Sequence, residues 1–188
     1  MRKTRESQLA LARREKLLVN FTRPFEQGSV LGYVLDIGPQ FLVVALVSDG
    51  IRLNGFQCFR LRDVRKLRVP HKYSAFVEVA LKKRRARIPK ESPVAVGKLQ
   101  NLLLSAGRKF PLVTIHREQV DPDVCYIGRV VGVSKGFVSL LEIGPDACWD
   151  AKPERYRLSE ITRVDFGGQY EEALYLVGGR PRKLARSQ

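Results

Sequence analysis

A short strand-like sequence occurs twice in this chain and constrains its fold more than any other feature. Residues 18–23 read LVNFTR, and residues 112–117 read LVTIHR. Each copy is followed by a turn-like loop and then by a Gly-led apolar segment, which begins at Gly32 or at Gly128. Self-similarity of this kind indicates a repeated structural unit. We therefore predict a tandem duplication of two units, each of roughly 90 residues.

Alternating and Val-rich stretches predict that each unit is mainly β. Val19 and Phe21 of the first copy match Val113 and Ile115 of the second, and this period of two is typical of a half-buried strand with these residues in the core. Short Gly-containing turns between the later apolar segments favour hairpins. The predicted later strands are 29–37, 41–48 and 64–69 in the first unit, and 125–133, 137–143 and 161–166 in the second.

Helical patterns flank the strands in both units. Residues 4–16 contain good helix formers behind Thr4, and residues 95–107 have leucines at helical spacing, with Ser92-Pro93 as a start and Gly107 as a stop. Two further helices have matching apolar faces that we expect in the core: Tyr73, Phe76, Val77, Ala80 and Leu81, and Tyr170, Ala173, Leu174 and Val177. The predicted fold class is mainly β with flanking helices (α+β), each unit being a small five-stranded barrel or bent antiparallel sheet.

The charge of the chain lies mostly outside the two predicted units. The net charge is +15, yet residues 17–81 and 91–179 are each close to neutral. The positive charge is concentrated at the two ends and in residues 82–90, which hold six basic residues and no acidic one. The predicted organisation is a first helix-plus-barrel repeat at 1–81, a basic linker at 82–93, a second helix-plus-barrel repeat at 94–179 and a basic tail at 180–188.

The basic linker is the sharpest functional signal in the sequence. Clustered cations gain affinity for a polyphosphate because binding releases condensed counterions. The alternative is a solvated linker that keeps a nearly neutral protein in solution. The candidate nucleic-acid-binding residues are Lys82, Lys83, Arg84, Arg85, Arg87 and Lys90.

No residue pattern predicts an active site, a metal site or a cofactor. His116, Glu118 and Cys125 are the one set that resembles a nucleophile with a base, and no Gly-rich oxyanion element accompanies them. The three cysteines show no paired spacing, and Cys58 and Cys125 lie in apolar runs where buried reduced thiols are expected. We predict a non-enzymatic protein of the cytoplasm, without a membrane-spanning segment.

The second unit has two further features that differ from the first. Trp149 and Tyr156 are candidate residues of an aromatic interaction rim, although aromatic side chains at a rim more often cover the core. Acidic residues in the loops are expected to be exposed turn formers or to attract the basic segments of the same chain. They are Asp121, Asp123, Asp146, Asp150, Glu154, Glu171 and Glu172.

The order of the helix, the strand, the Gly-led hairpin and the closing strands suggests a family resemblance. With Asn54-Gly55 and the RLRDV and RLSEI segments, each unit resembles an Sm-like small β-barrel, which is related to Src-homology-3-like barrels. The whole chain also resembles a family of uncharacterised bacterial proteins with endings like ITRVDFGGQYEEAL. The Sm-like resemblance implies a small barrel and RNA binding, whereas the bacterial family implies no activity.

Three functions remain open at this point. The first is a binding or regulatory module with an unknown protein partner. The second is an RNA- or DNA-binding protein that uses the basic linker and tails. The third is a structural or assembly protein that self-associates through unpaired strand edges. No membrane partner is expected.

Overall fold

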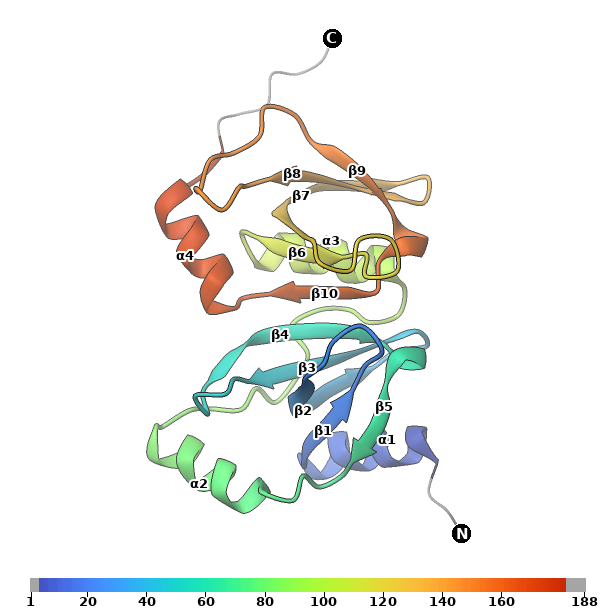
Figure 1. The fold of residues 1–188 in the computed structure, drawn as a ribbon, viewed down its shortest axis with the longest axis vertical. Helices are drawn as coiled ribbons and strands as arrows, with labels where there is room; N and C mark the ends of the chain where they lie inside the picture. The colour runs from blue at the N-terminus through green and yellow to red at the C-terminus, as the bar shows by residue number, and fades with distance from the viewer. Residues whose placement is uncertain (1–3, 182–188) are drawn as a thin grey trace.

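A computed structural model describes residues 4–181 and places ten strands in one antiparallel sheet (Figure 1). With four helices, the protein is mainly β, as predicted. The first half contains α1 (Arg5–Glu15), β1 (Leu18–Thr22), β2 (Ser29–Ile37), β3 (Phe41–Val47), β4 (Leu53–Arg60), β5 (Arg65–Arg68) and α2 (Ser74–Lys83). The second half repeats this order with α3 (Leu99–Lys109), β6 (Val113–His116), β7 (Cys125–Ser134), β8 (Phe137–Glu142), β9 (Glu154–Arg157), β10 (Arg163–Phe166) and α4 (Gln169–Gly178).

The two halves are joined through the sheet itself. The strand order is β5-β1-β2-β3-β4-β10-β6-β7-β8-β9. The fourth strand of the first half, β4, pairs with the last strand of the second half, β10, with Cys58 opposite Val164. The expectation of two separate barrels is therefore wrong. Neither half closes, because β4 pairs with β10 and not with β5 of its own half.

The repeated glycines hold the same position in both halves. Gly32 pairs with Val19 in the first half, and Gly128 pairs with Val113 in the second. A Cβ atom at Gly32 would lie 2.4 Å from the carbonyl oxygen of Ala45, and one at Gly128 would lie 2.2 Å from that of Leu141. Any larger residue would push the next strand away. Close approach of two strand backbones thus explains why each apolar segment begins with glycine.

The predicted helix boundaries hold for α1 and differ for α3. The Thr4 side chain caps α1 by accepting a hydrogen bond from the Ser7 backbone N–H, as the sequence indicates. The helix α3 begins only at Leu99, and Ser92 instead bonds locally to the backbone of Val94. Residues before Leu99 stay out of the helix because Val94 and Val96 are buried among the residues of the core.

Buried apolar side chains of residues 4–181 form three clusters. In the first half, Val19 and Phe21 lie under α1, and in the second half Val113 and Ile115 lie in the cluster that contains α3 residues. All four side chains are fully buried, which confirms the core predicted from the repeat. The third cluster joins the second half to α4 through Leu112, Ile127, Ile143 and Leu174.

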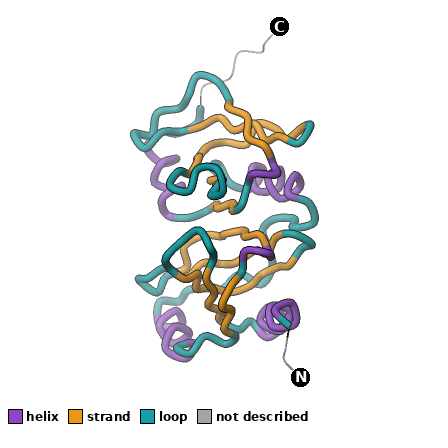
Figure 2. Tube along the Cα trace, turned by 45° about the vertical axis from the view of Figure 1, so that its right-hand side comes forward, coloured by secondary structure: helices purple, strands orange, loops and turns teal. Residues whose placement is uncertain are grey.

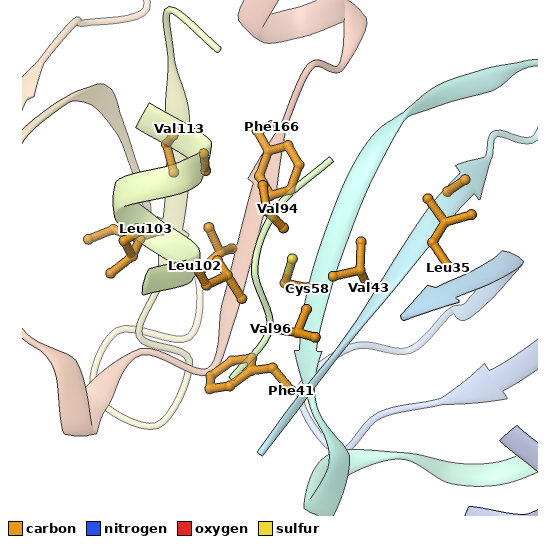
Figure 3. Close-up of a cluster of buried hydrophobic side chains, with 14 of the residues drawn as sticks. Leu35, Phe41, Val43, Cys58, Val94, Val96, Leu102, Leu103, Val113 and Phe166 are labelled. Atoms are coloured by element: carbon orange, nitrogen blue, oxygen red, sulfur yellow. The ribbon is translucent and has the colours of Figure 1, made fainter. Parts of the chain in front are cut away.

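The connector between the halves exposes the basic side chains of residues 82–90 but packs into the core at Val94 and Val96, just after the predicted linker. Val94 and Val96 belong to the same buried cluster as Val43 and Cys58 of the first half and Phe166 of the second. Figure 3 shows the connector running between the β4 side and the β10 side of this cluster. The connector therefore fixes the two halves in addition to the β4–β10 pairing.

Candidate functional site

The predicted nucleic-acid-binding residues lie at the end of α2 and in the chain that follows it. Lys82 and Lys83 occupy the last helical turn, where cations interact favourably with the helix dipole. Arg85 has a left-handed φ of 55°, and the Ala86 N–H donates a hydrogen bond to the carbonyl of Leu81 over 3.0 Å. This turn stops the helix and leaves six basic side chains exposed: Lys82, Lys83, Arg84, Arg85, Arg87 and Lys90.

This basic segment, residues 82–90, keeps its charge unneutralised. Within residues 4–181, none of its basic side chains forms an ion pair with a carboxylate. In the second half, Arg117 pairs with both Asp121 and Glu160, and none of the described acidic loop residues pairs with the basic segment. The acidic loops therefore leave the basic segment available to a partner. The predicted tail at 180–188 lies mostly outside the described residues.

Helices α2 and α4 each expose apolar side chains to solvent. Phe76 of α2 is 66% exposed, and Leu176 and Val177 of α4 are 84% and 77% exposed. Such large exposed apolar side chains on a helix often mark a contact surface. We name two surfaces by their exposed residues: the α2 face consists of Tyr73, Phe76 and Val79, and the α4 face consists of Tyr170, Leu176 and Val177.

The sequence placed most of these side chains in the core, and that prediction is wrong. Each helix contacts the sheet through a narrow stripe, formed by Val77 and Leu81 in α2 and by Leu174 in α4. Tyr175 of α4 is partly buried and packs against the third cluster, whereas the residues of the α2 face and the α4 face are exposed. In Figures 1 and 2 the two helices lie along the same side of the molecule, one in each half.

A buried ion pair crosses from one half to the other. Arg23 follows β1, and its guanidinium donates to both carboxylate oxygens of Glu118, which follows β6; one of these distances is 3.0 Å. The Arg23 side chain is fully buried, and the Glu118 side chain is 6% exposed. Burial would raise the pKa of Glu118, but the hydrogen bonds from Arg23 and Thr162 outweigh it and lower the pKa. No local sequence pattern signals this pair.

A second polar cluster surrounds Asp165 on β10. Arg163 Nε lies 2.8 Å from Asp165 Oδ1, and His116 Nε2 lies 3.1 Å from Asp165 Oδ2. Gln57 of β4 donates to the same carboxylate over 3.3 Å. Burial opposes ionisation of Asp165, but Arg163 and His116 outweigh it and lower the pKa to about 2. The cluster therefore holds a carboxylate ion at the joint between the halves.

The nucleophile-like set does not assemble an activated group. Cys125 lies opposite His116 in the β6–β7 register, but Glu118 is held by Arg23. Burial of the thiol and the negative charge of Asp165 raise the pKa of Cys125, which favours the thiol over the nucleophilic thiolate. Cys58 is buried as expected. Cys125, at the start of β7, is exposed as a residue, contrary to the prediction, although the surrounding chain partly desolvates its thiol.

Trp149 and Tyr156 have their polar atoms engaged within the chain. Trp149 Nε1 donates to the carbonyls of Gly178 and Gly179, each over 3.2 Å, and so holds the end of α4. The hydroxyl of Tyr156 donates to Glu142, and its ring packs 4.5 Å from the ring of Tyr126. Both side chains therefore have structural roles, and their interaction with a partner stays a prediction.

A groove lies between α1 and the connector. Its volume is about 810 Å³, and its lining includes Arg14, Lys16, Pro89 and Lys90. Arg13 in the wall of the groove pairs with Asp36 at 3.0 Å, so these two side chains neutralise each other. The lining also contains the acidic residues Glu6, Asp36 and Glu91, so the groove carries charges of both signs.

Comparisons of the chain with protein-family models, curated proteins and solved structures find no match. Over residues 4–181, no helix is both long and apolar enough to cross a membrane. The same residues contain no group of three His, Cys, Asp or Glu side chains placed to hold a metal ion. The Sm-like resemblance stays a prediction.

Proposed function

We propose that the protein is a non-enzymatic binding module that holds a polyanionic partner through its basic segment. We further propose that it arose by tandem duplication of a small five-stranded, Sm-like unit. The repeated element order and the matching Gly32 and Gly128 pairings support the duplication. A binding role agrees with the raised pKa of Cys125, which disfavours the thiolate in the nucleophile-like set.

The observation that carries this proposal is the unpaired charge of residues 82–90. The six cations follow one another closely, are all exposed, and lack carboxylate partners in the described part of the chain. Elsewhere, the buried Arg23 pairs with Glu118, and the partly buried Arg163 pairs with Asp165. Other exposed cations without a carboxylate partner within residues 4–181, such as Arg52, Lys109 and Arg129, are isolated from one another in the sequence. A cluster of exposed cations without carboxylate partners attracts a polyanion.

Self-association through sheet edges is the weaker alternative. The outer strands are β5, with exposed Arg65, Lys66 and Arg68, and β9, with exposed Arg155 and Arg157. Pairing of these edges between two molecules would bring like charges together, and charged edge strands generally oppose such pairing.

Immobilised heparin and a thymidine oligonucleotide provide the test. The variant K82Q/K83Q/R84Q/R85Q removes four charges from the basic segment, and R52Q/K109Q/R129Q/K152Q removes four exposed charges elsewhere. We expect the first variant to elute from heparin at lower salt than the second. On the oligonucleotide, its slope of log affinity against log salt should fall by about 3, at roughly 0.7 per contact. Equal behaviour of the two variants would refute the proposal.

A further inference from the structure

The α2 face and the basic segment occupy one continuous part of the surface. Phe76, Val79 and Lys83 are spaced by three and four residues, so they lie along one side of α2. Lys72 stands before the helix, with its ammonium 4.4 Å from the ring centre of Tyr73. Exposed apolar groups are thus bordered by cations at both ends of the helix.

The second half presents the same combination at the equivalent place. Leu176 and Val177 of α4 are strongly exposed, and the exposed Arg180 follows the helix directly. The sequence continues with the basic residues Arg182, Lys183 and Arg186, which lie outside the described residues. Because α2 and α4 lie along one side of the molecule (Figures 1 and 2), a single extended surface can reach both helices.

The chemistry of these faces selects among polyanions. The faces contain three aromatic residues, Tyr73, Phe76 and Tyr170, which can stack on nucleic-acid bases. The other three, Val79, Leu176 and Val177, are aliphatic and offer no stacking plane, and two of them are the most exposed apolar side chains of the faces. Against a second copy of the chain, the cations of one basic segment would face those of the other. An anionic lipid surface satisfies both features, because its headgroups attract cations and its acyl boundary accepts apolar side chains.

We propose that the partner is the surface of an anionic lipid bilayer, bound by the α2 face and the α4 face with the basic segment. This inference rests on the proposed function, since the basic segment supplies the charge. The helices lie on the bilayer and do not cross it. A surface cation contributes about fivefold to binding, and an aliphatic or aromatic side chain that enters the acyl boundary contributes about tenfold.

Sedimentation of the full-length protein with vesicles tests the inference. Vesicles of phosphatidylcholine alone are compared with vesicles that contain about 30% phosphatidylserine, a strongly anionic surface. The variant F76Q/V79Q/L176Q/V177Q removes the apolar groups without changing the charge, and glutamine keeps the helix propensity. The control V120Q/V124Q/V131Q changes exposed apolar residues away from α2 and α4.

We expect binding to the anionic vesicles only, and a loss of at least about tenfold in the helix-face variant. That variant should elute from heparin like the unchanged protein, and the control should bind vesicles normally. Vesicle binding that is insensitive to the helix-face variant would overturn the inference. Binding of heparin or oligonucleotide without binding of vesicles would also overturn it and would leave the proposed function standing. Failure to bind any of these polyanions would refute both.

Discussion

Replacing Glu118 by glutamine should strongly destabilise the junction between the two halves. Glutamine keeps the shape of the side chain but leaves the buried Arg23 guanidinium facing a neutral amide. Removing one partner of a buried ion pair costs about 3–5 kcal/mol. Arg23 also lies 3.1 Å from Glu26 and 4.8 Å from the centre of the Phe59 ring, and these contacts remain. We therefore expect the lower end of that range, about 3 kcal/mol.

Equilibrium unfolding in urea measures this loss. At about 2–4 °C per kcal/mol, the melting temperature should also fall by roughly 6–12 °C. Glu160→Gln is the matched control, because Glu160 also pairs with an arginine, Arg117 at 2.9 Å, but its side chain is 29% exposed. Its cost should stay below about 1 kcal/mol, as for other exposed pairs.

A double-mutant cycle with Arg23→Met shows whether the effect belongs to the pair. When both charges are removed, no unpaired buried charge remains, so the double variant should be more stable than the sum of the single changes implies. A cost below about 1 kcal/mol for Glu118→Gln, at an unchanged denaturant slope, would refute the argument from buried charge.

Three further predictions follow from burial and close contacts. Gly128→Ala should cost about 1–3 kcal/mol in the free energy of unfolding, whereas Gly132→Ala on the same strand, with no atom within 4 Å of its added Cβ, should cost much less; similar values would contradict the packing argument. Asp165 ionises more readily in the folded protein, so its contribution, about 2 kcal/mol, should be present above pH 4 and be lost between about pH 4 and 2; Asp165→Asn should flatten the pH dependence of stability there. A thiol reagent should modify two of the three cysteines in the native protein and Cys58 only after unfolding, and rapid reaction of all three would contradict its burial.

The repeated sequence predicts the elements well because local chemistry dictates them. Val19 and Val113 are each followed by a polar residue and then by another core residue, and the glycine opposite each valine is required by the next strand. Thr4 caps α1 through a bond three residues away, which is a signal that sequence alone can carry. These contacts are short-range or occur in both halves, so they can be predicted from a single sequence.

The arrangement of the elements depends on contacts that leave no local signal. Cys58 and Val164 pair across more than half of the chain, and neither residue indicates its partner. The helical pattern of α2 shows that Phe76 and Val77 are both apolar, but only the narrow contact with the sheet decides that Val77 is buried. The composition of residues 82–93 predicts a basic linker because cations dominate it, whereas the packing contacts of the connector come from Val94 and Val96, which follow that segment.

The β4–β10 pairing also determines how the two apolar helix faces act together. Because this pairing is part of a continuous sheet, α2 and α4 are held at a fixed separation. Two weak contacts on a rigid frame reinforce each other, and avidity can exceed single-site affinity by about 10²–10⁴-fold when both are engaged. The fixed separation therefore makes binding depend on the size and curvature of the partner surface. A surface too small or too sharply curved to contact both helices is bound by only one of them.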